Sequence, residues 1–91
     1  MQESSRTYKA TSAFWNCFNN LPQDVQIRAK RKFDLFKRNP RHPSLEFEKL
    51  GIGYWRVKIG DGYRALAFED EDGLCWFWIG NHRTYERIIR E

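Results

Sequence analysis

Three cations in the second half of the chain have the types and spacing of a phosphate-binding site. Arg56 and Lys58 are two residues apart in a stretch that alternates apolar and polar side chains, so they project from one face of a strand. Arg64 lies in the next alternating stretch, and it joins that face if its neighbours pack on the other face. Such cations bind phosphate oxygens through charge-assisted hydrogen bonds, and Arg can make two parallel bonds. The alternative is that they are ordinary solvated strand residues.

A histidine and a tyrosine follow the last expected strand. His82 and Tyr85 are three residues apart at the start of an expected terminal helix, so they share one side of it. The imidazole of His82 can take or give a proton near neutral pH. Tyr85 can stack on a base or donate to a phosphate, but it can equally pack on the sheet, because Ile88 lies in the same stripe.

Carboxylates and thiols add less to this site. Glu46 and Glu48 can supply a general base if they face the cations, and their alternation with apolar residues points them to solvent or to the open sheet face. No pair of carboxylates is placed to hold a catalytic metal, and the two His and two Cys lack metal-ligand spacing. We therefore expect no metal and no cofactor, with Cys17 and Cys75 as packed thiols.

The first half of the chain must supply helices. Thr11 or Ser12 can cap a helix that breaks at Asn19-Asn20, and Pro22 suits the first turn of a second helix that ends at Asn39-Pro40. The second helix has an apolar stripe at helical spacing, formed by Val25, Ala29, Phe33 and Phe36. The two helices should form a hairpin, and a short strand over residues 7–10 fits before it.

The second half must supply the strands. Period-two patterns predict strands at Trp55–Ile59, Tyr63–Phe68 and Leu74–Ile79, with an earlier strand at Leu45–Leu50. Glycine-containing turns at residues 60–62 and 72–73 make the last three strands an antiparallel meander, and Asn81 can cap the terminal helix. The predicted fold is α+β, with an N-terminal helical hairpin on one face of an antiparallel sheet and a short C-terminal helix. The other face is partly open and carries Tyr54 and the three cations.

Composition limits the class of protein. The chain has 91 residues, which suits a single domain over 1–91, and a net charge of +4. Residues 28–49 contain eight cations and three anions. This positive surplus suits binding to a polyanion or an acidic partner, although a solvated helix face explains the surplus as well. No apolar run approaches the ~20 residues of a membrane span, and the N-terminus has no secretory signal. We therefore expect a cytoplasmic protein without a membrane partner.

In order and spacing, these motifs resemble the RelE/ParE superfamily of toxins in bacterial type II toxin–antitoxin pairs. The resemblance spans nearly the whole chain. It is carried by Tyr54-Trp55-Arg56-Val57-Lys58-Ile59, by Gly62-Tyr63-Arg64-Ala65-Leu66, and by Trp76-Phe77-Trp78-Ile79-Gly80-Asn81-His82 with Tyr85 following. In the RelE-like branch, whose members cut mRNA on the ribosome, the basic strand residues correspond to Arg56 and Lys58, and the hairpin arginine to Arg64. A residue that is basic or His after the last strand corresponds to His82.

The resemblance therefore implies a ribosome-dependent mRNA endonuclease that inhibits translation and is neutralised by a cognate antitoxin. RNA cleavage by the 2′-hydroxyl needs a base, an acid and cations for the phosphate charge. On this reading Arg64, His82, Lys58 and Arg56 are catalytic, and Tyr54 and Tyr85 bind substrate. Two alternatives stay open: a ParE-like inhibitor of DNA gyrase that does not cut RNA, and a non-catalytic member that only binds antitoxin.

Overall fold

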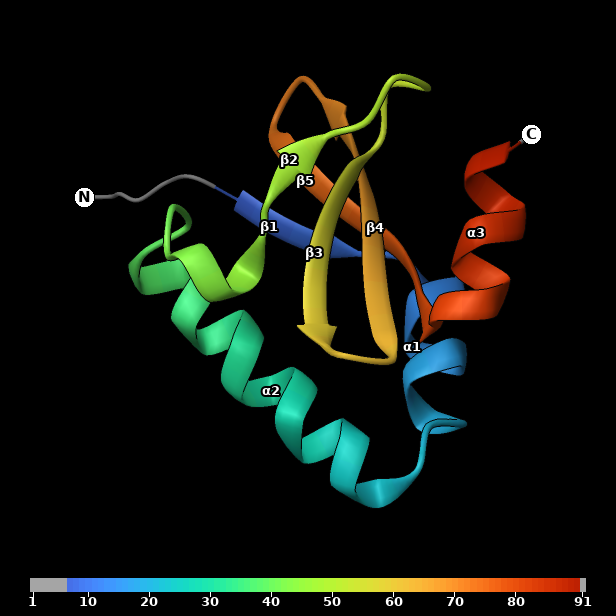
Figure 1. Cartoon of the computed structure of the whole chain (residues 1–91). Coiled ribbons are helices and arrows are strands. Elements are labelled where there is room, and N and C mark those ends of the chain that lie inside the picture. Colours follow the sequence, from blue (N-terminus) through green and yellow to red (C-terminus); the bar gives the residue numbers. More distant parts are fainter. Residues whose placement is uncertain (1–6, 91) are drawn as a thin grey trace.

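The computed structural model describes residues 7–90, which form a five-stranded sheet with helices around it (Figure 1). The helices are α1 (Ser12–Asn19), α2 (Gln23–Arg38) and α3 (His82–Arg90), with a short 3-10 helix, η1 (Pro43–Leu45). The strands are β1 (Thr7–Ala10), β2 (Glu48–Lys49), β3 (Trp55–Gly60), β4 (Tyr63–Asp70) and β5 (Gly73–Asn81). Among residues 7–90 no helix is long and apolar enough to cross a bilayer.

The strands lie in the order β1-β5-β4-β3-β2. Tight turns connect β3, β4 and β5, and these three neighbours run antiparallel, as the alternation and the glycine turns predict. The edge strand β1 pairs parallel with β5, so the sheet as a whole is mixed. The predicted α+β architecture, with its helical hairpin, meander and C-terminal helix, is confirmed.

Side-chain caps begin two of the helices where the sequence predicts. Thr11 Oγ1 accepts a hydrogen bond from the Phe14 N–H at 3.0 Å, which caps α1. Asn81 Oδ1 accepts from the Thr84 N–H at 2.8 Å in the first turn of α3. Helix α2 follows Pro22 and ends at Arg38, with Asn39 as its C-cap residue. The caps fix where each helix leaves the sheet, and therefore where the residues of α3 lie.

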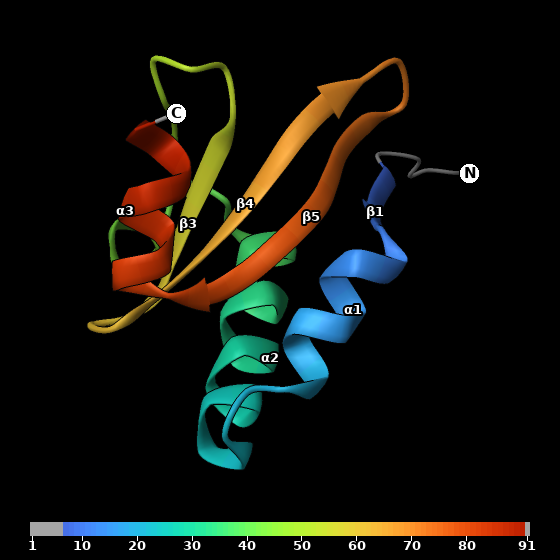
Figure 2. The ribbon, with the colours of Figure 1, turned by 90° about the vertical axis from the view of Figure 1, so that its right-hand side faces the viewer.

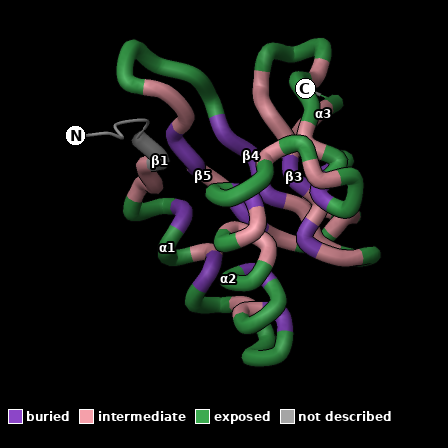
Figure 3. The backbone as a smooth tube through the Cα atoms, turned by 90° about the vertical axis from the view of Figure 1, so that its left-hand side faces the viewer, coloured by how far each residue is buried: buried purple, intermediate pink, exposed green. Residues whose placement is uncertain are grey.

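The core is an aromatic layer between the α1–α2 hairpin and one face of the sheet. Rings of Phe36 and Trp76 meet edge to face with centroids 5.7 Å apart, a favourable aromatic geometry. The buried cluster also contains Phe14, Phe18, Ala29, Leu45, Val57, Ile59, Ala65, Ala67 and Ile79. Figure 3 shows buried segments along the middle of β4 and β5. This packing covers β3 and β4 from one side.

Helix α3 lies on the other face of the sheet (Figure 2). Leu66 on β4 and Tyr85 on α3 are both buried, although neither belongs to the core under the hairpin. The face predicted to be partly open is therefore covered in part by α3. The strands β3 and β4 are enclosed between the hairpin and this helix, which leaves a smaller exposed area around the predicted cations.

The expected strand over Leu45–Leu50 is wrong in extent. Only Glu48–Lys49 pairs with β3, and Leu45 ends η1 instead. Pro43 occupies the first turn of η1, and Glu46 then adopts a left-handed conformation with φ 45°. The turn lets Leu45 and Phe47 both pack against the core. Their spacing of two residues had been interpreted as the alternation of a strand.

Strand β5 departs from simple alternation. Leu66 pairs with Trp78 while Ala67 pairs with Trp76, so Phe77 is an extra residue in a β-bulge. The Phe77 ring contacts the Tyr54 ring, with centroids 4.8 Å apart. The strand also continues through Gly80 to Asn81, two residues past the predicted last residue, Ile79. The bulge thus adds a ring to the sheet face opposite the hairpin.

Candidate active site

The pairing of β3 with β4 brings the three predicted cations together. Lys58 lies directly opposite Arg64, and Arg56 is two residues away along β3. Val57 and Ala65, which form the neighbouring pair, are buried under the hairpin, so the three cations share the opposite face. We call this the cation face. The parity argument for Arg64 is confirmed.

Arg56 is held by protein groups on several sides. Its Nε and Nη2 donate to the carbonyl oxygen of Glu46 at 3.2 and 3.1 Å, and its Nη1 lies 3.4 Å from the hydroxyl oxygen of Tyr85. Nη2 also lies 3.2 Å from a carboxylate oxygen of Glu48, and the side chain is only 15% exposed. Arg56 therefore connects β3 with the 46–48 segment and with α3.

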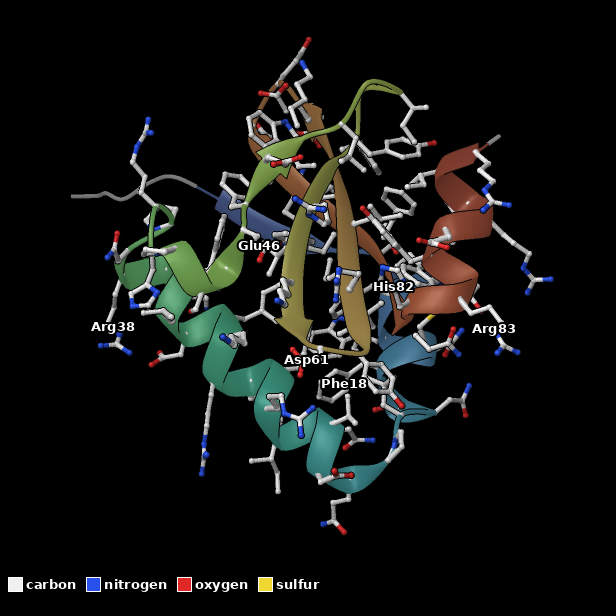
Figure 4. The ribbon with its side chains drawn as sticks, viewed as in Figure 1. Phe18, Arg38, Glu46, Asp61, His82 and Arg83 are labelled. Atoms are coloured by element: carbon white, nitrogen blue, oxygen red, sulfur yellow. The ribbon has the colours of Figure 1, made fainter. Side chains whose placement is uncertain are left out.

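Lys58 is the more accessible strand cation. Its Nζ lies 3.3 Å from Oε2 of Glu46 and 3.9 Å from a carboxylate oxygen of Asp61. Its side chain is 28% exposed, about twice the fraction of Arg56. Figure 4 shows Glu46 and His82 on either side of β3 and β4, with Asp61 at the turn below them. Lys58 thus lies between Glu46 and His82, where its ammonium group can meet a phosphate.

Arg64 is anchored but keeps donors for a ligand. Its Nη1 donates to the carbonyl oxygens of Gly60 and Tyr63, both at 2.9 Å, which fixes the side chain at the β3–β4 turn. Its guanidinium carbon lies 5.9 Å from the centroid of the Tyr85 ring. Within residues 7–90, Nη2 has no hydrogen-bond partner and Nε is buried without one. A fixed guanidinium with an unused Nη2 suits an incoming phosphate oxygen.

His82 and Tyr85 share a side of α3, as predicted, but their environments differ. The backbone N–H of His82 donates to the Gly62 carbonyl at 2.8 Å, which joins the start of α3 to the β3–β4 turn. The imidazole is 40% exposed, and its Nε2 lies 3.7 Å from a carboxylate oxygen of Glu86. Tyr85 is only 4% exposed, with its ring centroid 5.5 Å from that of His82. The imidazole is open to a substrate, whereas the roles predicted for these two residues stay predictions.

Tyr54 lies two residues before Arg56, just ahead of β3. It lines a groove of about 780 Å³ between the turn before β3 and α3, together with Ile52, Thr84, Arg87 and Ile88. The sequence placed Tyr54 on the face of Arg56, and the structure adds residues of α3 to its surroundings. Its role in substrate binding stays a prediction.

Glu46 is the residue that the predicted site lacked. It was considered only as one of two carboxylates that can act as a base, and the structure places its Oε2 beside Lys58. Its left-handed backbone turns the carbonyl to Arg56 and the carboxylate to Lys58. In the sequence, the only sign of this position was that Glu46 lies between two apolar residues. That pattern indicated the sheet face of the side chain but not the left-handed turn after η1. Within residues 7–90, no group of three or more His, Cys, Asp and Glu is placed to hold a metal ion.

A second feature lies on the opposite side of the sheet, between α1 and α2. A groove of about 310 Å³ is lined mainly by rings, with Lys30, Asp34 and Lys37 among its polar residues. Trp15 lies at this groove and is 50% exposed, although its ring contacts Phe14 and Phe18. An exposed indole beside an apolar groove is unusual for a surface without a partner.

Comparison with known proteins identifies the class. The family model of the ParE-like toxin domain matches residues 23–87, so the chain belongs to the ParE-like toxin family. No curated protein sequence matches the chain. With the fold described above, this makes it a toxin of the toxin–antitoxin type.

Solved structures with the same fold are distant in sequence. YafQ from E. coli strain BL21(DE3) is 13% identical, with a TM-score of 0.70 over 88% of this chain and 97% of that chain. The RelB–RelE antitoxin–toxin complex from Methanococcus jannaschii contains a chain that is 13% identical, with a TM-score of 0.68 over 88% and 96%. The YoeB/ParE toxin from Agrobacterium tumefaciens is 19% identical, with a TM-score of 0.64 over 84% and 98%. At these identities the likeness concerns the fold.

Proposed function

We propose that the protein is the toxin of a type II toxin–antitoxin pair that inhibits translation in the cytoplasm by cutting mRNA on the ribosome. The observation that carries this proposal is the arrangement on the cation face. A carboxylate, two cations and an imidazole lie on or beside it in the order Glu46, Lys58, Arg64 and His82. These are the groups that cleavage by a neighbouring 2′-hydroxyl requires, without a metal.

The proposed reaction moves one proton at each end of the scissile bond. Glu46 takes the proton of the 2′-hydroxyl, and that oxygen attacks phosphorus. The bond from phosphorus to the 5′-oxygen breaks, and a protonated His82 gives its proton to the leaving oxygen. The products are a 2′,3′-cyclic phosphate and a 5′-hydroxyl. Lys58 and Nη2 of Arg64 stabilise the negative charge that develops on the phosphate oxygens.

Arg56 has a different place in this proposal from the one that its spacing predicted. Its donors contact the Glu46 carbonyl, Glu48 and Tyr85, so little of the guanidinium faces solvent. We assign it the role of a positioning residue, which holds the backbone of Glu46 and thereby the carboxylate near Lys58. Its charge still contributes to the positive potential of the cation face.

The proposed antitoxin has a surface to bind on the hairpin side. The aromatic groove between α1 and α2 exposes Trp15, and Lys30 and Lys37 beside it have no ion pair within residues 7–90. This suits an amphipathic segment with acidic side chains, because apolar contacts supply affinity and opposite charges orient the partner. The basic run of residues 28–49 begins in α2, on this side of the sheet (Figure 2).

The family model also keeps the gyrase alternative in view, because it is named for ParE-like toxins. The two activities separate in one experiment. The protein is expressed from an inducible promoter, cleaved ends of translated mRNA are mapped by primer extension, and gyrase supercoiling is assayed with purified protein. We expect mRNA cleavage for the wild type. Growth arrest with inhibited supercoiling and intact mRNA would replace the nuclease by a gyrase inhibitor.

Single substitutions then test the site. Arg64→Ala should abolish cleavage, since the fixed guanidinium acts on the transition state. His82→Ala should reduce it by roughly 10²-fold or more. Lys58→Ala should have a smaller effect because Arg64 lies directly opposite. Circular dichroism is the control that each variant is folded. If folded Arg64→Ala and His82→Ala both cut mRNA at the wild-type rate, the site is wrongly assigned. If the wild type neither cuts mRNA nor inhibits gyrase but binds antitoxin, the non-catalytic alternative holds.

A further inference from the structure

The groove that contains Tyr54 has the size and lining of a ligand site. Its volume of about 780 Å³ lies within the range of small-molecule and cofactor pockets. Tyr54 supplies a ring, Ile52 and Ile88 supply apolar surface, and Thr84 and Arg87 supply polar groups. None of the five lining residues is acidic. The lining therefore combines an aromatic face with a positive charge, which is the combination that binds unpaired nucleotides.

The aromatic wall is held in place before any ligand arrives. The Tyr54 ring packs on Phe77, and Phe77 packs on Phe68, with centroids 4.8 and 5.8 Å apart. Two backbone hydrogen bonds close the turn before β3: Leu50 N–H donates to the Tyr54 carbonyl at 2.7 Å, and Gly53 N–H donates to the Leu50 carbonyl at 2.9 Å. A ring fixed in this way loses little conformational entropy when a base stacks on it.

The positive wall comes from α3, which carries cations that nothing neutralises within residues 7–90. Arg83, Arg87 and Arg90 are exposed and have no ion pair there, whereas the only acidic residue of the helix, Glu86, lies beside His82. Figure 4 shows Arg83 pointing away from the body of the molecule. Arg87 lies at the groove itself. The cations of this helix favour the phosphate groups of a nucleic-acid backbone.

The groove adjoins the proposed reaction site. Tyr54 is two residues before Arg56 in the sequence. Thr84 precedes Tyr85, whose hydroxyl contacts Arg56. At about 3.3 Å per residue along an extended strand, Tyr54 and Arg56 are roughly 7 Å apart. An RNA strand bound at the cation face therefore reaches the groove within a small number of nucleotides.

We propose that this groove binds an unpaired base of the RNA that flanks the reacting phosphate, with the base stacked on Tyr54 and the adjacent phosphate on Arg87. The inference rests on the proposed nuclease function and deepens it, because it names the groove that holds the base beside the reacting phosphate. A base inside a duplex is stacked on both sides, so only an unpaired base can use the Tyr54 ring. The groove also predicts a base preference beside the cleavage site.

The test uses a short single-stranded RNA with 2′-O-methyl groups, which cannot be cut by its own 2′-hydroxyl. Binding is measured by anisotropy, and the amide signals of Tyr54, Thr84 and Ile88 are followed by NMR. Tyr54→Leu, which keeps apolar contact with Phe77, should weaken binding about tenfold. Arg87→Gln should reduce the salt dependence of binding by about one phosphate contact. Arg31→Gln, an exposed arginine on the outer helix α2, is the matched control and should bind like the wild type.

Each result has a definite meaning. Weaker binding by both groove variants, with shifts at the groove amides and weak binding of the same sequence as a duplex, supports the inference. Wild-type affinity in both folded variants overturns it, as does RNA binding that leaves the groove amides unmoved. If the wild type still cleaves translated mRNA while Tyr54→Leu and Arg87→Gln change neither binding nor the cleavage positions, the inference fails and the proposed function stands. If the wild type cleaves no mRNA, the proposed function fails.

Discussion

The guanidinium of Arg56 and the hydroxyl of Tyr85 meet above the sheet, with Nη1 3.4 Å from the phenol oxygen. Through this contact β3 is joined to α3, and through Nε and Nη2 the same side chain holds the carbonyl of Glu46. Three segments that are distant in sequence thus depend on one side chain. The position of the proposed base relative to the proposed acid is a consequence of this connection.

Arg56→Ala should lower the free energy of unfolding by about 1.5–3 kcal/mol, because it removes charge-assisted hydrogen bonds that are largely shielded from water. Arg56→Lys should not restore stability, since one ammonium group cannot replace the separate donors that reach the Glu46 carbonyl and the Tyr85 hydroxyl. Urea unfolding measures both. Lys58→Ala is the control, with a more exposed ion pair and a change below about 1 kcal/mol. Equal stability of all three variants would contradict the positioning role.

Glu46→Gly should abolish mRNA cleavage without destabilising the protein. Glu46 has a φ of 45°, which costs a non-glycine residue about 1 kcal/mol, and glycine adopts it freely. The lost ion pair with Lys58 is partly exposed and contributes little. Unfolding curves and primer extension, carried out on the same preparation, separate stability from activity. Glu71→Gly, in the exposed turn after β4, is the control for cleavage. Cleavage at the wild-type rate by Glu46→Gly would exclude it as the base.

Trp15→Ser should weaken binding to the cognate antitoxin while leaving toxicity unchanged, because Trp15 lies at the aromatic groove on the side away from the cation face. Loss of a central aromatic anchor typically costs about 2 kcal/mol or more in binding, roughly a thirtyfold change in Kd. Ile27→Ser is the matched control, since Ile27 is 48% exposed against 50% for Trp15. Calorimetry with purified antitoxin measures the difference. An equal effect of the two variants would show that the groove is not the binding surface.

Asp70→Asn should reduce stability near neutral pH, and the difference from the wild type should close in acid. The hydrogen bond from Lys9 to Asp70, 2.7 Å long, lowers the pKa of that carboxyl below its usual 3.8 and raises the pKa of the Lys9 ammonium above 10.5. A lowered carboxyl pKa adds stability above 3.8, and this stability is lost as the pH falls through the folded-state value. Urea midpoints at neutral pH and well below 3.8 test this. Glu71→Gln, in the same turn, should show no such closing gap.

Much of this protein follows from local pattern. Thr11 and Asn81 cap helices because their short side chains accept from backbone N–H groups nearby in sequence, and the glycine turns force β3, β4 and β5 into an antiparallel order. Period-two alternation was enough to place Arg64 with Lys58, because a strand in a packed sheet must turn its apolar side to the core. The fold class and the common face of the three site cations were therefore predictable.

The tertiary structure decided where those groups act. Glu46 reaches Lys58 only because a left-handed residue after η1 breaks the expected strand, and Arg56 stabilises that turn from another part of the chain. The groove at Tyr54 exists because α3 lies across the sheet face and the bulge at Phe77 adds a ring there. Sequence patterns report backbone preferences over a few residues. The distances between Glu46, Arg56 and Tyr85 depend instead on how separate segments pack, and no local pattern encodes them.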